Sequence, residues 1–296
     1  MKSKNLFLIL IVFSCSNFLN TNKLKAESYQ KSYRERGNES LLKKNLGNAI
    51  NYFTKALQNY PNDFFIYFQR GLARYENGDI NGSIEDYTKS INLNPFNREA
   101  YNNRGVSYSI LGEYKKAISD FNNALHETKS YQNENDILEN LAFAKFSFGD
   151  YSEAKEDYFK IINNNPSNSN AYTGLGKIFY YKNDLDSALI NLSKATKLNS
   201  KDQYAYFYKG KTFYKLNRLS ESENNFSKSI KIDPFNEEFF TKRALARKKM
   251  NNKFSACKDL EQAIYLGKKE IDKKLFDYCK ALSLIHISEP TRQDRI

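Results

Sequence analysis

The sequence is poor in the residues that most often perform chemistry. Its 296 residues include no tryptophan, two histidines and three cysteines. With only His126 and His286, it has no His and Cys ligands at zinc spacing and no base for a Ser-His-Asp triad. Its 12 glycines are spread along the chain instead of clustering after a strand, which excludes a phosphate-cradling glycine loop. Composition therefore predicts no enzyme activity, no metal site and no cofactor.

Charge and hydrophobic runs are also limited. The formal net charge is +12, but residues 1–26 carry four lysines and no acid, which leaves +8 for the rest of the chain. Such an excess concerns solubility and non-specific association and does not specify a fold. The main apolar stretch, Leu6–Leu19, is 14 residues long, whereas a membrane-spanning helix needs about 20.

Residues 1–26 resemble an export signal, because Lys2 and Lys4 precede this apolar run. Two processing routes are open, and an uncleaved interfacial anchor is a third alternative. Cleavage after Ala26, a small residue, would release a soluble protein. The stretch Val12–Cys15 instead resembles a lipobox, which would make Cys15 a lipidated residue, although Phe13 is bulky for that motif. We expect an exported protein in the periplasm or another extracytoplasmic compartment, anchored to the membrane only if Cys15 is lipidated.

The five prolines are few, but four of them recur in one phase. Pro61, Pro95, Pro166 and Pro234 follow one another at spacings of 34, 71 and 68 residues. In units of 34 residues that place proline at position 32, position 8 is mostly glycine: Gly37, Gly71, Gly105, Gly176 and Gly210. Position 20 is always small: Ala49, Ser83, Ala117, Ala154, Ala188, Ser222 and Ala256. Position 24 is large and apolar: Phe53, Tyr87, Phe121, Tyr158, Leu192, Phe226 and Leu260. A fixed period of this length indicates a repeat array.

The third unit allows the repeat to be compared with a known family. Its residues match the tetratricopeptide repeat, a helix-turn-helix unit of 34 residues, in type and spacing: Tyr101, Gly105, Tyr108, Gly112, Tyr114, Ala117, Phe121 and Ala124. The resemblance implies an all-α fold, an α-α superhelix (solenoid) of about seven such repeats. The units run over residues 30–63, 64–97, 98–131, 135–168, 169–202, 203–236 and 237–270, and residues 271–281 begin a capping helix.

Small residues at positions 8 and 20 are expected to face each other where the two helices of a unit cross. The turn between the helices carries residues that tolerate the left-handed conformation ending a helix: Gly78, Gly112, Gly149, Asn183, Asn217 and Asn251. Unit three lacks the proline and is followed by three extra residues in the segment 130–134, where we expect a kink or a flexible loop. Units five and seven have Ser200 and Lys268 in place of proline. The unbroken spacing across unit five predicts continuous stacking there.

Residues 282–296 do not look natural. Leu282–Arg292 resembles a translated transposon-end sequencing adapter, so the alternative of an authentic disordered tail is disfavoured. We exclude this tail, with His286 and Pro290, from functional reasoning.

Positions 7 and 23 pair arginine with aspartate in three units: Arg70 with Asp86, Arg104 with Asp120, and Arg243 with Asp259. We interpret these as structural ion pairs that bridge the helices of a unit, since guanidinium suits bidentate contact with a carboxylate. The competing interpretation is that the arginines bind a ligand.

Two cysteines lie in the repeat region, on either side of a turn near Gly267. Cys257 and Cys279 could form a disulfide in an oxidising compartment. Two independent buried thiols are the default interpretation, because cysteine is among the most often buried residue types.

In this family the first helices line a concave groove, and the resemblance carries the groove positions onto this chain. The amino half has polar residues there: Arg34, Asn38, Gln69, Asn102 and Asn103. The carboxyl half interleaves aromatic residues with lysine: Lys177, Tyr180, Tyr181, Tyr204, Phe207, Tyr208, Lys211, Tyr214, Lys215 and Lys248. This combination suits an extended peptide of acidic or carboxyl-terminal character. The alternative is that several of these tyrosines pack between helices.

These features predict a non-catalytic protein-protein interaction scaffold in a bacterial envelope, with a protein or peptide partner that is acidic. Single-stranded nucleic acid could also stack on such a surface, but export argues against that partner. One alternative is a module for an anionic envelope polymer or membrane surface, and another is the regulatory part of a truncated enzyme.

Overall fold

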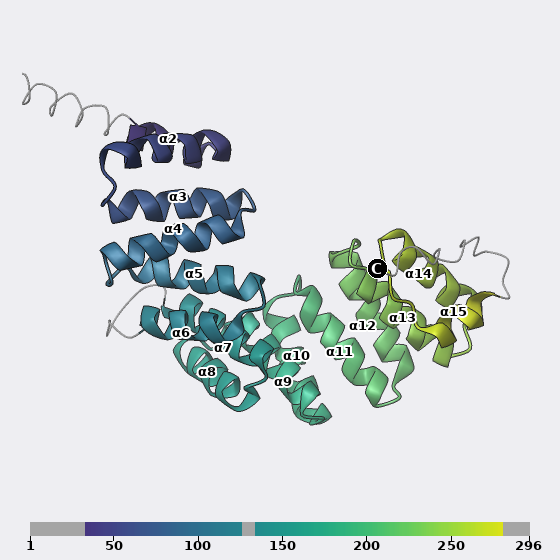
Figure 1. Ribbon diagram of the computed structural model, residues 1–296. Coiled ribbons are helices and arrows are strands. Elements are labelled where there is room, and N and C mark those ends of the chain that lie inside the picture. The colour runs from purple at the N-terminus through teal and green to yellow at the C-terminus, as the bar shows by residue number, and fades with distance from the viewer. Residues whose placement is uncertain (1–32, 126–133, 281–296) are drawn as a thin grey trace, which may run out of the picture. The chain divides into compact units, whose positions relative to one another are not determined.

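A computed structural model describes residues 33–125 and 134–280, which form helices joined by short turns (Figure 1). The chain divides into two compact units between Phe148 and Gly149. We call them the amino unit and the carboxyl unit, and each is described by itself. The predicted all-α fold of helix-turn-helix repeats is confirmed, and no strand occurs in the described ranges. The predicted export signal, His126, the segment 130–133 and the tail lie outside them.

The amino unit stacks helix pairs one upon another. Residues 33–42 are helical. They are followed by α2 (Leu46–Asn59), α3 (Phe64–Glu76), α4 (Ile80–Leu93), α5 (Arg98–Ile110), α6 (Tyr114–Leu125) and α7 (Glu134–Phe148). Each of these helices packs on the next, and α5 also contacts both α3 and α7. The first helices of successive repeats therefore form one layer.

The carboxyl unit repeats this arrangement. Its helices are α8 (Tyr151–Asn164), α9 (Ser169–Tyr181), α10 (Leu185–Leu198), α11 (Gln203–Lys215), α12 (Leu219–Ile232), α13 (Glu237–Lys249), α14 (Lys253–Tyr265) and α15 (Lys273–Lys280). Helix α11 contacts both α9 and α13, and α13 also contacts α15. Helix α10 packs on α11 although Ser200 stands in place of proline there. Helices α9, α11, α13 and α15 thus form one layer, which carries the candidate site.

Polar residues at two fixed positions of the repeat cap the amino ends of the helices. These caps were not among the features predicted from the sequence. Their side-chain oxygens accept a hydrogen bond from a backbone N–H in the first turn, which satisfies a donor without an intrahelical partner. Position 34 supplies the caps of first helices: Asp63, Asn97, Asn168, Asp202 and Asn236. Position 16 supplies the caps of second helices: Asn45, Asp79, Asp184 and Asn252.

The predicted left-handed turn occurs at position 15 of every repeat. The φ angle there is positive at Gly78, Gly112 and Gly149, and at Asn183, Asn217 and Asn251. The first repeat has Lys44 at this position, with φ 57°. Glycine and asparagine adopt this conformation at low cost, which explains their recurrence.

The glycines at position 8 have a different partner from the one predicted. We expected them to face the small residues of position 20, but a Cβ added to them would meet the large side chain of position 24. In the third repeat, the added atom on Gly105 would lie 2.7 Å from the ring of Phe121, and in the fifth, that on Gly176 would lie 2.4 Å from Leu192. Position 20 remains close, since Ser222 Oγ donates to the Gly210 carbonyl at 2.8 Å. The glycine is therefore required because a large side chain fills the crossing.

Tyr87 differs from the other position-24 residues in having a buried hydroxyl that, among the described residues, has no hydrogen-bond partner. Burial raises the pKa of this hydroxyl, so it stays protonated. Phenylalanine fills the position in three other repeats, for example at Phe53.

Because an unsatisfied buried polar group costs about 1–3 kcal/mol, we expect Tyr87→Phe to stabilise the amino unit by about 1 kcal/mol in urea unfolding. Tyr265→Phe, at an exposed tyrosine, is the control and should change nothing; equal stability of Tyr87→Phe and the parent chain would contradict the prediction.

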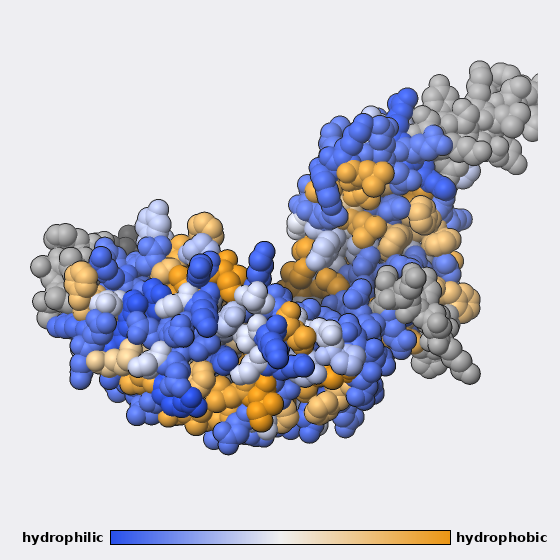
Figure 2. Space-filling model, turned by 180° about the vertical axis from the view of Figure 1, so that it is seen from behind, coloured by the Kyte–Doolittle hydropathy of each residue, from blue (hydrophilic) through white to orange (hydrophobic). Residues whose placement is uncertain are grey.

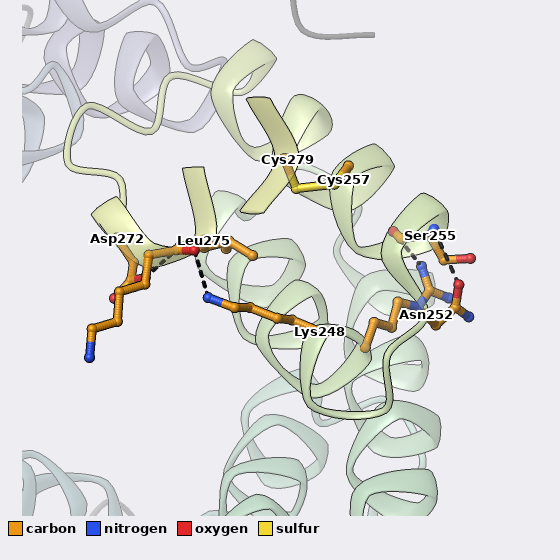
Figure 3. The surroundings of a disulfide bond; sticks show 9 residues. Lys248, Asn252, Ser255, Cys257, Asp272, Leu275 and Cys279 are labelled. Atoms are coloured by element: carbon orange, nitrogen blue, oxygen red, sulfur yellow. Dashed lines mark hydrogen bonds between the residues drawn. A yellow bond between two sulfur atoms is a disulfide. The ribbon is translucent and has the colours of Figure 1, made fainter. Parts of the chain in front are cut away.

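A disulfide joins Cys257 of α14 to Cys279 of α15 (Figure 3). The default interpretation of two independent thiols is therefore wrong. Both side chains are buried, in a cluster that includes Leu260 and Leu275. Their Cα atoms lie 5.4 Å apart because α15 packs directly on α14, and this separation is within the range that a disulfide can bridge.

The face drawn in Figure 2 is mostly hydrophilic, and hydrophobic residues form separate areas on it. Among the described helices, none combines the length and the apolar character needed to cross a membrane.

Candidate functional site

Two neighbouring helices of the carboxyl unit carry most of the predicted groove residues. Helix α9 provides three of them and α11 provides six. Without Phe207 of α11, whose ring is buried, they are Lys177, Tyr180, Tyr181, Tyr204, Tyr208, Lys211, Tyr214 and Lys215. We call these eight residues the lysine–tyrosine surface. They share one layer because α9 and α11 are first helices of successive repeats and contact each other.

The ammonium group of Lys211 lies among aromatic rings. Its Nζ atom is 4.6 Å from the ring centroid of Tyr208, 5.0 Å from that of Tyr180 and 5.8 Å from that of Tyr181. A cation over an aromatic face within about 6 Å is attracted by the ring quadrupole. These contacts fix the lysine and the rings relative to one another.

The tyrosines also contact each other across the two helices. Tyr180 and Tyr208 meet edge to face, with ring centroids 5.7 Å apart. The hydroxyl oxygens of Tyr181 and Tyr208 lie 3.3 Å apart, within hydrogen-bond range. Lys177 Nζ is 5.1 Å from the ring of Tyr204 and 5.2 Å from that of Tyr208. The surface is thus held rigid by its own side chains, which lowers the entropy cost of binding.

This surface carries uncompensated positive charge. Burial lowers the pKa of Lys177, although the nearby Asp202 acts in the opposite direction. Burial also lowers the pKa of Lys211, where the neighbouring lysines 242, 215 and 177 add to the effect and Glu238 opposes it. Within the described residues, no carboxylate forms an ion pair with Lys177 or Lys211. An anion bound here would stabilise both ammonium groups.

The tyrosine hydroxyls of the surface remain available as donors. Burial raises the pKa of Tyr180, Tyr208 and Tyr214, so these side chains stay protonated at neutral pH. Tyr181 and Tyr204 are the most exposed rings, at 47% and 44% of their full area. The expected alternative, that several tyrosines pack between helices, therefore describes the half-buried Tyr208 better than these two.

Two predicted groove residues do not belong to the surface. Phe207 is 3% exposed and packs against Phe226 and Phe239, so its ring is part of the core. Lys248 donates from Nζ to the carbonyl oxygen of Lys274 in α15 at 2.6 Å, the dashed line from Lys248 in Figure 3. The Lys248 Nζ also lies 5.4 Å from the ring centroid of Tyr278. The position of Lys248 was predicted from the repeat register, which contains no information about the closing helix that engages it.

The structure also reveals a residue that the sequence interpretation missed. A pocket of about 280 Å³ opens between α9, α11, α12 and α13, and Lys242 lines it together with Lys211 and Lys215. Lys242 occupies position 6 of its repeat, as Tyr208 does in the preceding one, so the register could have found it. Tyr151 of α8 was missed as well; its ring stacks on Tyr181 at 6.0 Å.

Three of the five predicted groove residues of the amino unit have polar contacts within that unit. Asn140 donates to the side-chain oxygen of Asn102 at 3.2 Å, and Asn102 donates to that of Asn103 at 3.3 Å. Arg34 lies 3.7 Å from Asp63 and over the ring of Phe65. This face has no lysine–tyrosine arrangement comparable to that of the carboxyl unit in its described part.

The structure brings all three predicted arginine–aspartate pairs together. Arg104 donates from Nε and one terminal nitrogen to the two carboxylate oxygens of Asp120, both at 2.8 Å, and its other terminal nitrogen donates to Thr88 of the preceding repeat at 3.0 Å. Arg70 repeats this geometry with Asp86 and Thr54. All three guanidinium nitrogens are engaged, which supports the structural interpretation over ligand binding.

The third pair includes a further arginine. Arg243 holds Asp259 at 2.9 and 2.6 Å and donates to Ser227 at 3.0 Å. Arg247 also donates to Asp259, at 2.9 Å, and to Glu223 at 2.7 Å. The hydroxyl contacts at Thr54, Thr88 and Ser227 link successive repeats, a role that the sequence interpretation did not assign.

The described residues contain no group of three or more His, Cys, Asp or Glu side chains that could hold a metal ion.

Several curated sequences related to this chain are named as repeat proteins. It is 28% identical over 157 residues to a TPR repeat-containing protein of Methanocaldococcus jannaschii, an alignment that covers 50% of this chain and 26% of that protein. It is 30% identical over 120 residues to the Hsp70-Hsp90 organizing protein 3 of Arabidopsis thaliana, covering 37% of this chain and 22% of that protein. The chain thus spans about a quarter of the length of these relatives.

A solved structure and three family matches also indicate tetratricopeptide repeats. A tetratricopeptide repeat protein from Parabacteroides merdae has the same fold, with a TM-score of 0.71 and 17% identity over 86% of this chain and 98% of that one. Residues 71–112 match the family described as TPR repeat, and residues 99–127 and 173–237 match two described as tetratricopeptide repeat. The chain therefore belongs to the tetratricopeptide repeat proteins.

Proposed function

We propose that this protein is a non-catalytic scaffold of the bacterial envelope whose lysine–tyrosine surface binds an extended acidic segment of a partner protein. The observation that carries the proposal is the set of half-buried lysines between tyrosine rings. Among the described residues, no carboxylate is in ion-pair contact with Lys177 or Lys211. Lysine supplies attraction for an acidic chain, and rigid tyrosine rings supply contact area at low entropic cost.

Two further observations support parts of this proposal. Repeat proteins related to this chain include one named for organising the chaperones Hsp70 and Hsp90, which is consistent with a scaffold. The Cys257–Cys279 disulfide suits an oxidising compartment, as expected of an exported protein. Whether export ends in release after residue 26 or in lipidation of Cys15 is decided by the intact mass of the mature protein.

The proposal is tested by selecting peptides from a random displayed library on the full chain and measuring their affinity by fluorescence anisotropy. We expect the selected peptides to be rich in Asp and Glu. Their binding should weaken at least tenfold in a Tyr181→Ala, Lys211→Ala double variant, since a lost charge-assisted hydrogen bond alone costs about 1.5–3 kcal/mol. Added salt should weaken binding further by screening.

The matched control is a Tyr206→Ala, Lys228→Ala double variant. These two side chains form another lysine–tyrosine contact in the same unit, with Nζ 5.4 Å from the ring centroid, but they are outside the lysine–tyrosine surface. Circular dichroism establishes that both variants fold. Equal weakening in the two variants would refute the proposed site. A sulfated dextran that competes as strongly as the peptides would favour an anionic polymer as the ligand.

A further inference from the structure

The charged residues that line the pocket between α9, α11, α12 and α13 all have the same sign. Its charged lining residues are three lysines: Lys211 and Lys215 from α11, and Lys242 from α13. Tyr180 and Tyr214 add hydroxyl groups, and the remaining lining is apolar. No carboxylate lines it, so every charged residue around its volume of about 280 Å³ is a lysine.

Within the part of the chain that the structure describes, these three lysines have no carboxylate in ion-pair contact. Lys215 donates to the carbonyl oxygen of Tyr180 and to the side-chain oxygen of Asn183, both at 3.3 Å and both neutral acceptors. Among the described residues, neither Lys211 nor Lys242 forms an ion pair. Glu238 is the acidic group that acts on Lys211 from a distance, while Lys242 and Lys215 act in the opposite sense. Clustering like charges in a partly desolvated pocket is unfavourable unless a ligand carries the opposite charge.

The charge of the anion, more than the type of cation, distinguishes the candidate ligands. The forked guanidinium of arginine holds carboxylates and phosphates alike, and no arginine lines this pocket. Lysine presents a compact charge with three rotatable donors, which suits the oxygens of a tetrahedral group approached from several sides. A phosphate monoester carries about −1.5 to −2 charge at pH 7 and three acceptor oxygens, so it compensates more of the lysine charge than one carboxylate does.

We propose that the pocket lined by Lys211, Lys215 and Lys242 binds a phosphate monoester carried by the partner segment. This rests on the proposed function, because the pocket and the lysine–tyrosine surface on which that segment would lie share four residues: Tyr180, Lys211, Tyr214 and Lys215. The surface then anchors an extended chain, and the pocket selects chains that are phosphorylated.

The direct test uses small probes on the full chain at constant ionic strength. Phenyl phosphate and benzoate share a ring and differ in their anion, and inorganic phosphate serves as a third probe. Isothermal titration calorimetry should show phenyl phosphate binding at least tenfold more tightly than benzoate, and Lys242→Gln should weaken it about tenfold, as expected for loss of one charge-assisted bond. Lys228→Gln removes a lysine of the same unit outside the pocket and should have no effect.

Several results would overturn the phosphate assignment. They are equal affinity for benzoate, equal losses in Lys242→Gln and Lys228→Gln, and no binding of either aromatic probe. A phosphatidic acid vesicle that binds in a Lys242-dependent manner, when a phosphoserine peptide does not, would replace the peptide phosphate with a lipid headgroup and so overturn the proposal as stated.

Failure of this inference can be told apart from failure of the proposed function. A peptide selected on the surface is synthesised with aspartate or with phosphoserine at one position. If both forms bind alike and both depend on Tyr181 and Lys211, the scaffold function stands and the phosphate pocket does not. If neither peptide responds to those substitutions while phenyl phosphate still requires Lys242, the pocket stands and the peptide surface does not.

Discussion

Replacing Asp259 with alanine is expected to lower the stability of the carboxyl unit by about 3–5 kcal/mol, because removal of one member leaves buried charges unpaired. The carboxylate is 3% exposed and accepts hydrogen bonds from both Arg243 and Arg247. Its loss removes the only described carboxylate bonded to Arg243, while Arg247 keeps Glu223. Urea unfolding monitored by circular dichroism measures the effect.

Two comparisons make this prediction sharper. Asp120→Ala removes a carboxylate that the structure bonds to a single arginine, Arg104, so its cost should be smaller than that of Asp259→Ala. A double variant, Arg243→Met with Asp259→Leu, replaces charge with apolar volume and should recover part of the lost stability. Unchanged stability of Asp259→Ala would show that these ion pairs do not hold the helices together.

Removal of the disulfide by Cys279→Ala is expected to cost the carboxyl end about 2–4 kcal/mol and to release α15. This helix has eight residues, too few to be stable in isolation, and is held by the disulfide, by Leu275 and by the Lys248 bond to Lys274. Hydrogen exchange of residues 273–280 should accelerate in the variant, while exchange in the amino unit should not change.

Chemical reduction of the Cys257–Cys279 disulfide tests independently whether this bond holds α15. A reducing agent added to the parent chain should reproduce the exchange pattern of Cys279→Ala and have no further effect on that variant. Cys15→Ala is the control for the remaining thiol and should behave as the parent chain does. If α15 stays fully protected after reduction, the apolar contacts of Leu275 are sufficient and the disulfide is not needed to hold the helix.

The features that depend on position within the repeat could be predicted from sequence. The left-handed turn at position 15 is an example, since Gly112 and Asn217 share one backbone conformation that few other residues adopt easily. The pairing of Arg104 with Asp120 is another, because two fixed positions on crossing helices must meet wherever both residue types occur. The 34-residue period was therefore sufficient to predict these turns and contacts.

The candidate site could be predicted only in part, because it depends on neighbours that differ from repeat to repeat. Phe207 holds a groove position, but Phe226 and Phe239 provide an apolar space that buries it. Lys248 also holds such a position, but α15 provides a carbonyl acceptor for it. Lys242 contributes to a pocket only because α11 places two more lysines beside it. Such combinations are a property of particular neighbours, which the repeat pattern does not describe.

The link between Cys257 and Cys279 also decides how this end of the molecule would respond to mechanical force. Tension applied on the carboxyl side of Cys279 passes through the sulfur atoms into α14 and bypasses the intervening chain. Cysteines 22 residues apart in sequence enclose a length that, fully extended, would reach roughly 75 Å at about 3.4 Å per residue. While the disulfide is intact, this segment cannot extend under tension. When the disulfide is reduced, the segment can unfold and extend. The oxidation state of one bond would therefore set how far this end of the protein can extend under tension.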